Sequence, residues 1–301
     1  MSVLVTTVDG YHIFASSGKH LTALEGHRVE CFVPGSDGTW LAVVDRHAIW
    51  SHGRDGTWTP IAESTHGLTG VVGVGDVVYA GTANARVLCG ASSATLEPVE
   101  SFDTVAGRDA WHAVGMPLQV RSMTATAHDH ELLVNVHVGG IPRSADGGIT
   151  WQPTIDVDAD VHQVLAHPTR PEIVVAAASV GLCRSRDGGA TWHTTDDGME
   201  LSYARAVTII DDDVLVTGSE GPGSARAAVY RASVDGGPVT KVMGGLPDFV
   251  AGNIDTGCIA SDGARVAFVD GNGDVWQSSE GCDGFERIAD GLAGVTGVAV
   301  A

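Results

Sequence analysis

Short apolar segments alternate with glycine-rich turns along the whole chain, and no stretch of useful length has the 3.6-residue period of an amphipathic helix. Residues 71–74, 77–81 and 132–138 are valine-rich segments bounded by polar or glycine residues, a pattern typical of β-strands. Such segments come in groups of about four, and each group takes about 43 residues. The pattern therefore predicts an all-β protein built from repeated four-stranded antiparallel units.

An eight-residue motif marks two of these units. Residues 144–151 are Ser-Ala-Asp-Gly-Gly-Ile-Thr-Trp and residues 185–192 are Ser-Arg-Asp-Gly-Gly-Ala-Thr-Trp, so the two tryptophans lie 41 residues apart. Asp-Gly-Gly lets the chain reverse where positive φ is needed, and the Asp side chain can accept hydrogen bonds from nearby backbone N–H groups. Thr-Trp then begins a new strand, with the indole expected against an apolar face. We interpret the motif as structural.

The motif resembles the Asp-box (BNR) repeat, and degraded copies stand at residues 54–58, 233–237 and 278–285. The resemblance implies a β-propeller in which each box closes the turn between the third and fourth strands of a blade. Many bacterial proteins with such repeats carry sialidase-like or glycoside-hydrolase names. In that family the boxes are structural, and ligands bind on the opposite face.

Seven blades of this size fill the 301 residues, and six is the alternative count. The first blade has only three strands, at residues 3–8, 11–16 and 20–24, whereas residues 295–300 form a final apolar strand without a following partner. We expect this last strand to complete the first blade and close the ring, because closure removes exposed sheet edges. No linker divides the chain, so we expect one domain over residues 1–301.

Composition restricts the partners. A net charge of −20 disfavours nucleic acids and anionic membranes, which both need a basic protein surface. Five widely spaced cysteines do not suggest a disulfide framework, and no apolar run has membrane length. Residues 1–14 lack the pattern of a signal peptide. We therefore expect an acidic cytoplasmic protein with a small-molecule or sugar-like ligand; no organic cofactor is indicated, and the oligomeric state is not defined.

The sharpest candidate chemistry is Asp160-Val161-His162, beside His137 of the preceding blade. Strand alternation places Asp160 and His162 on the same side of their strand. Two imidazoles and a carboxylate could act as acid–base groups, could hold a divalent metal, or could merely satisfy backbone groups at strand ends. All three alternatives remain open at this point.

Other polar residues are expected around the same mouth. Arg121 and Arg205 could hold a carboxylate or phosphate, or could pair with protein carboxylates. Tyr203 could donate a proton, stack on a ligand or simply pack. The remaining candidates are Glu220 as a catalytic group, Asp45 and Asp255 as ligand-binding groups, and Trp111 with His112 either as a lid over the mouth or as a pinned surface loop.

The resemblance also suggests a function. Sialidases of this superfamily use three arginines on the substrate carboxylate, a tyrosine nucleophile paired with glutamate, and an aspartate acid–base group, on six blades. This chain offers Arg121, Arg205, Tyr203 and Glu220, and it lacks a third arginine and the Phe-Arg-Ile-Pro segment of that family.

Three functions are consistent with the sequence. The first is an enzyme with hydrolase, lyase or isomerase chemistry on a small polar or anionic metabolite. The second is a sialidase-like glycoside hydrolase or a non-catalytic propeller that binds a glycan or another ligand. The third is a protein-interaction scaffold. A funnel of convergent charged groups favours the first, whereas an exposed apolar rim would favour the third.

Overall fold

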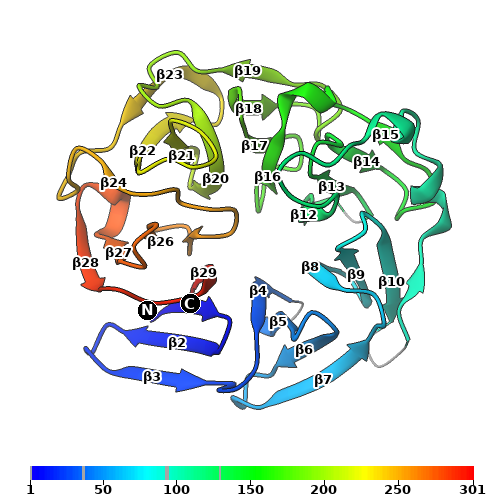
Figure 1. The fold of residues 1–301 in the computed structure, drawn as a ribbon, viewed down its shortest axis with the longest axis horizontal. Coiled ribbons are helices and arrows are strands. Elements are labelled where there is room, and N and C mark those ends of the chain that lie inside the picture. The colour runs from blue at the N-terminus through cyan, green and yellow to red at the C-terminus, as the bar shows by residue number, and fades with distance from the viewer. Residues whose placement is uncertain (1, 36–37, 92–94, 129) are drawn as a thin grey trace.

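The computed structural model describes residues 2–35, 38–91, 95–128 and 130–301, and it forms a ring of seven antiparallel sheets around a central axis (Figure 1). Each sheet is one four-stranded blade of a β-propeller, and blade six carries an additional short strand. The predicted seven-bladed propeller is therefore confirmed, and the alternative of six blades is wrong.

The strands of the first four blades follow, from the innermost strand outward. Blade one contains β29 (Val295–Val300), β1 (Ser2–Thr7), β2 (Gly10–Ala15) and β3 (His20–Ala23). Blade two contains β4 (Val29–Pro34), β5 (Trp40–Val44), β6 (Ala48–His52) and β7 (Trp58–Glu63). Blade three contains β8 (Leu68–Val74), β9 (Val77–Thr82), β10 (Val87–Ala91) and β11 (Glu97–Pro98). Blade four contains β12 (Val120–Ala125), β13 (Leu132–Val136), β14 (Pro142–Ser144) and β15 (Gln152–Pro153).

The other three blades complete the ring. Blade five contains β16 (Val161–Ala166), β17 (Val174–Ala178), β18 (Gly181–Ser185) and β19 (His193–Thr195). Blade six contains β20 (Tyr203–Ile210), β21 (Asp213–Ser219), β22 (Arg226–Ser233) and β23 (Gly236–Lys241), with β24 (Val250–Ala251) also pairing with β22. Blade seven contains β25 (Ile259–Ser261), β26 (Val266–Val269), β27 (Val275–Ser278) and β28 (Phe285–Ala289).

The helical residues form short 3₁₀ turns, namely η2 (Glu100–Thr104), η3 (Arg108–Ala110), η4 (Val157–Ala159) and η5 (Glu280–Cys282). Within the described part of the chain, no helix has the length and apolar character needed to cross a membrane. All five cysteines are free, as the absence of a disulfide pattern in the sequence indicated.

The ring closes between the two ends of the chain, as predicted. β29 pairs antiparallel with β1, with Val300 opposite Val3 and Val298 opposite Val5 (Figure 1). These four valines are buried in one apolar cluster with residues of blade seven. Burial of their side chains, together with the strand hydrogen bonds, fixes the last strand in the first blade.

The eight-residue motifs form the turns between the third and fourth strands of blades four and five. In the first copy, the Asp146 carboxylate accepts hydrogen bonds from the Thr150 hydroxyl at 2.6 Å and from the Thr150 amide at 2.8 Å. These bonds hold the pKa of Asp146 below its usual value. The Trp151 indole is buried edge-on against Phe102, at 5.0 Å between ring centroids. The turn thus fastens its blade to the neighbouring apolar cluster.

We predict that Gly189→Ala, in the second motif copy, lowers the free energy of unfolding by about 2–4 kcal/mol. Gly189 has a φ of +85°, and an added Cβ would lie 2.2 Å from the Leu133 side chain, which is fully buried. Gly237→Ala is the matched control because Gly237 has a similar φ of +93° with open space around it. Denaturant unfolding should show a loss of about 1–2 kcal/mol for the control. Equal losses in the two variants would contradict the steric explanation.

Candidate functional site

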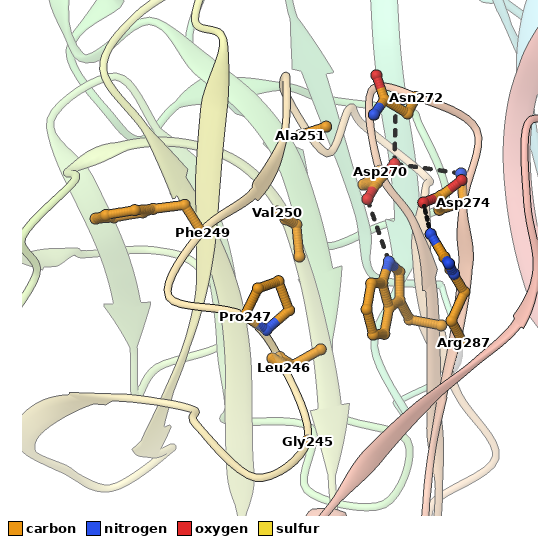
Figure 2. Close-up of a pocket in the computed structure, with 11 residues that line it drawn as sticks. Gly245, Leu246, Pro247, Phe249, Val250, Ala251, Asp270, Asn272, Asp274 and Arg287 are labelled. Carbon is orange, nitrogen blue, oxygen red and sulfur yellow. Dashed lines mark hydrogen bonds and ion pairs between the residues drawn. The ribbon is translucent and has the colours of Figure 1, made fainter.

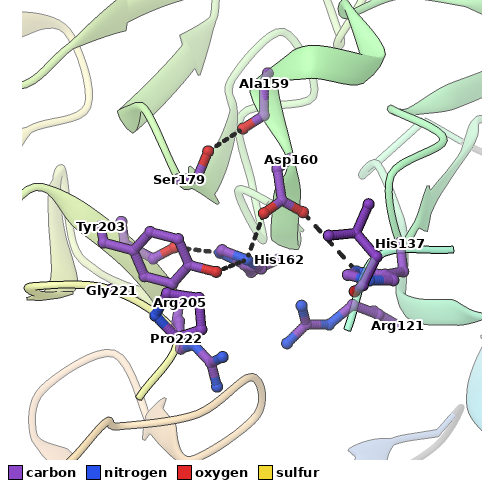
Figure 3. Close-up of polar contacts among 12 residues, drawn as sticks. Arg121, His137, Ala159, Asp160, His162, Ser179, Tyr203, Arg205, Gly221 and Pro222 are labelled. Atoms are coloured by element: carbon purple, nitrogen blue, oxygen red, sulfur yellow. Dashed lines mark hydrogen bonds and ion pairs between the residues drawn. The ribbon is translucent and has the colours of Figure 1, made fainter. Parts of the chain in front are cut away.

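The innermost strands of all seven blades surround a channel with a volume of about 1450 Å³. These strands begin at one mouth of the channel, on the face opposite to the motif turns. At this mouth the channel wall carries a group of charged side chains, which are Arg28, Glu30, Arg46, Arg121 and Asp255. Six polar residues of blades four to six flank the mouth and form what we term the mouth cluster: Arg121, His137, Asp160, His162, Tyr203 and Arg205 (Figure 3).

His162 and Tyr203 form a hydrogen-bonded pair between blades five and six (Figure 3). The Nδ1 atom of His162 lies 2.6 Å from the carbonyl oxygen of Ala204, which can only accept, so Nδ1 carries a proton. In the neutral ring, Nε2 is then the acceptor for the Tyr203 hydroxyl at 3.1 Å. Burial and the charge of Asp160 raise the pKa of Tyr203, so its hydroxyl remains protonated near neutral pH.

Asp160 follows η4 in a left-handed conformation, with a φ of 44°, and its carboxylate lies between two imidazole rings (Figure 3). Its Oδ2 atom is 3.4 Å from Nε2 of His162, and its Oδ1 atom is 3.8 Å from Nδ1 of His137. When Nε2 of His162 carries a proton, its hydrogen bond to Asp160 holds the pKa of Asp160 below its usual value, so the carboxylate stays ionised. Asp160 therefore stabilises His162 when that ring takes up a second proton.

The two histidine rings are almost inaccessible, with side-chain exposures of 6% for His137 and 1% for His162. His137 donates Nε2–H to the carbonyl oxygen of Val114 at 2.9 Å, and burial lowers the pKa of His137. Asp160 and Tyr203 are more exposed. A ligand at the mouth would therefore meet these two side chains, with the histidines acting behind them.

Two arginines of the mouth cluster extend into the same space (Figure 3). Arg205 forms an ion pair with Asp255. Arg121 donates to the Thr256 hydroxyl at 2.9 Å, and it forms no ion pair with any residue that the structure describes. Burial and the nearby charge of Arg205 lower the pKa of Arg121. Arg121 is thus a half-buried cation whose charge is not balanced by direct contact with a carboxylate.

Two of the predicted acidic residues lie in other contacts. Glu220 forms an ion pair with Arg226 at 2.8 Å and is not hydrogen bonded to Tyr203, so the tyrosine–glutamate pair of the sialidases is not formed between these two residues. Asp45, on blade two, accepts from Nδ1 of His27 at 2.7 Å and from the Arg28 amide at 2.8 Å. The structure therefore brings neither carboxylate into the mouth cluster.

For Trp111 and His112, the contacts favour the pinned loop over the lid. Trp111 is 8% exposed, and its ring packs against Phe102 and under the Arg108 guanidinium, at 4.5 Å from the ring centroid. The fully buried Phe102 anchors this segment, which turns the indole into the core and away from a ligand. His112 is exposed, and its Nδ1 lies 3.0 Å from the carbonyl oxygen of Ala110. Trp111 and His112 therefore belong to a loop held against the protein and do not form a lid over the mouth.

The metal alternative for His137, Asp160 and His162 is not supported. In the described part of the chain, no group of three or more His, Cys, Asp or Glu side chains is arranged to hold a metal ion. One nitrogen of each ring is already engaged with a backbone carbonyl. The arrangement fits a proton relay between Tyr203, His162 and Asp160.

Sequence reasoning missed three residues at the mouth, Arg28, Glu30 and Thr256. Arg28 and Glu30 lie two positions apart at the start of β4, so strand alternation was a signal that could have paired them. Thr256 precedes β25, and no sequence signal distinguishes this threonine from the others. It connects three blades, because its hydroxyl accepts from Arg121 and lies 3.1 Å from the carbonyl oxygen of His162.

A second hollow of about 730 Å³ lies between blades six and seven, lined in part by Phe249 and Trp276 (Figure 2). Its polar groups bind one another. Asp270 accepts from the Trp276 indole at 3.2 Å, and Asp274 forms an ion pair with Arg287 at 2.7 Å. Since both carboxylates are bound to neighbouring protein groups of blade seven, we place the candidate site at the channel mouth.

Comparisons with family models and with curated proteins give no match. Solved structures show the same fold. An ancestral GH74 enzyme superposes with a TM-score of 0.67 at 12% identity, covering 98% of this chain and 41% of that one. The GH74 xyloglucanase from Xanthomonas campestris superposes with a TM-score of 0.59 at 16% identity, covering 87% of this chain and 46% of that one. This chain thus spans less than half the length of either GH74 protein.

Proteins of other kinds are similar to a comparable degree. The computationally designed Ika8 protein has a TM-score of 0.61 at 13% identity, covering all of this chain and 87% of that one. U3-55K has a TM-score of 0.62 at 12% identity, covering 91% of this chain and 85% of that one. At these identities the likeness defines the fold alone. The chain is a seven-bladed β-propeller, with GH74 enzymes among its structural neighbours.

We predict that Asp160 contributes to stability in a pH-dependent way. Its pKa in the folded protein is below the unfolded value of about 3.9, so its contribution is present above that pH and is lost as the pH falls through the folded pKa. The Tm difference between the wild type and Asp160→Asn should therefore be largest near neutral pH and shrink towards pH 3. Thermal unfolding followed by circular dichroism between pH 3 and neutral pH measures this Tm difference. Asp158→Asn, at an exposed residue of η4, is the control. A constant difference would contradict the prediction.

Proposed function

We propose that the channel mouth binds a small polar ligand with an anionic group, and that Tyr203, His162 and Asp160 act on it as an acid–base unit. The observation that supports this most directly is Arg121, a half-buried guanidinium without a carboxylate partner among the described residues. A buried charge without a counter-charge is costly, so an anionic ligand that reaches it gains a strong charge-assisted interaction.

The hydrogen bonds of the mouth cluster favour proton abstraction. Tyr203 can take a proton from a bound ligand, or from a water beside it, while passing its own hydroxyl proton to Nε2 of His162. The resulting imidazolium lies 3.4 Å from the ionised Asp160, which stabilises its charge. Such a relay serves an isomerase or lyase when the proton comes from the ligand, and a hydrolase when it comes from water.

A glycoside hydrolase or a glycan-binding propeller is the second candidate. Its support is the likeness of fold to GH74 enzymes and the resemblance of the motif turns to Asp boxes, which we propose these turns to be. Glu220 does not support a sialidase-like site, because it is paired with Arg226. We further propose a reducing, cytoplasmic location, in keeping with five free cysteines.

We predict that Arg121→Gln abolishes anion binding without unfolding the protein. Wild-type protein is screened by thermal shift at low ionic strength against small carboxylates, sugar acids and sugar phosphates. The variant should lose the ligand-induced shift while keeping a Tm at or above that of the wild type, since it removes an unbalanced charge. Arg143→Gln is the control, because Arg143 is also half-buried but is paired with Glu131 at 3.1 Å. That control should lose stability and keep the ligand shift. A ligand shift that survives Arg121→Gln contradicts the anion site.

Tyr203→Phe separates binding from chemistry. With a ligand found in the screen, we expect the Kd of this variant to stay within about threefold of the wild type, while turnover falls by about 10²–10⁴-fold. Calorimetry measures the first and product analysis by mass spectrometry the second. If wild-type protein leaves every bound ligand chemically unchanged, the propeller binds without catalysis and the acid–base part of the proposal fails.

A further inference from the structure

A second group of cations lies on the channel wall at blade two. Glu30 accepts a hydrogen bond from Nη2 of Arg28 at 2.9 Å through one oxygen, and its other oxygen forms an ion pair with Nε of Arg46 at 3.0 Å. Its side chain is only 12% exposed, and both oxygens are engaged. One carboxylate therefore pairs with two guanidinium groups, while Asp45, another carboxylate of blade two, accepts from the Arg28 amide and interacts with His27.

Three polar atoms in and beside this group have no hydrogen-bond partner. The Nε atoms of Arg28 and Arg46, and the Oγ1 atom of Thr69 at the start of β8, are buried and lack a hydrogen bond to any described residue. All three residues line the channel. Unpaired buried donors cost free energy in the folded protein, and an anion or an ordered water that pairs with the group recovers part of that cost.

Arginines are concentrated at this mouth although the molecule as a whole is acidic. Four arginines stand around the mouth, and among the described residues only Glu30 and Asp255 form ion pairs with them. Asp160 is nearby but lies between the two imidazole rings. In a protein with a net charge of −20, arginines concentrated at one mouth attract small anions and orient them.

We propose that the ligand carries two anionic groups, carboxylate or phosphate, and that it spans the mouth. One group binds Arg121 and Arg205, as in the function proposed above, on which this inference rests. The other binds Arg28 and Arg46 on blade two. The two sites lie on different blades of a rigid ring, so their separation selects the length of the ligand. Monoanions can occupy only one site at a time.

The experiment is calorimetry at low ionic strength with matched ligands. Succinate, glutarate and adipate form a dicarboxylate series of increasing length, with propionate as the monoanion. Fructose 1,6-bisphosphate and fructose 6-phosphate form the phosphate pair. We expect at least one dianion to bind about 10–100-fold more tightly than its monoanion, because each charge-assisted pair gained adds to the affinity.

Arg28→Gln tests the second site. Since Arg46 keeps Glu30 paired, this variant leaves no buried carboxylate without a partner. It should weaken the dianion to about the affinity of the monoanion and leave the monoanion unchanged, whereas Arg121→Gln should weaken both. Arg143 lies away from the mouth and is paired with Glu131, so Arg143→Gln should change the affinity of neither anion.

The outcomes separate the two proposals. In one outcome, monoanions bind with an affinity that Arg121→Gln lowers, but dianions bind no more tightly and their affinity is unchanged by Arg28→Gln. The second site is then wrong and the proposed function stands. If no anion of either series binds with an affinity that depends on Arg121, the proposed function fails and this inference fails with it. Tighter binding of the carboxylate or of the phosphate series identifies which anionic group the mouth selects.

Discussion

The pairing of β29 with β1 is the constraint on which the mouth depends. Ser2 and Ala301 exchange backbone hydrogen bonds at 2.6 and 2.9 Å, and the valines between the two strands fill the interface with blade seven. With β29 in place blade one is complete, so each of the seven blades packs between two neighbours. The starts of the innermost strands then meet at one mouth with fixed spacing. Residues more than eighty positions apart, such as Arg121 and Thr256, can bond only because of this closure.

Most of the fold could be predicted because its signals are local. Valine-rich strands, turn residues at a regular interval and the surplus apolar strand at the end were sufficient for seven closed blades. The site was less predictable because it depends on partners from different blades. The sequence left Trp111 as either a lid or part of a pinned loop, because the packing of Phe102, nine residues earlier, decides which way the indole points. Glu220 was misassigned because Arg226, six residues later, reaches it across a turn.

The acid–base cluster was predicted in composition but not in accessibility. Asp160, His162 and His137 do converge, as strand alternation indicated, yet both rings are covered and each has one nitrogen bound to a backbone carbonyl. That arrangement fixes the tautomer of His162 and leaves Nε2 as its one variable position. From the sequence, Tyr203 could be a proton donor, a stacking residue or a packing residue. Its hydrogen bond to His162 makes it the group through which His162 could act on a ligand.

The strong negative charge of the chain and an anionic ligand are compatible because electrostatic interactions are local. At physiological ionic strength the screening length is about 8 Å, so carboxylates on the outer blades have little influence at the centre of the ring. The proposed ligand would instead meet the arginines of the channel wall, which lie in a less polarisable environment where charges interact more strongly. Net charge therefore disfavours extended polyanions such as nucleic acids, which would also contact the acidic outer surface. A small anion that fits inside the mouth avoids that surface.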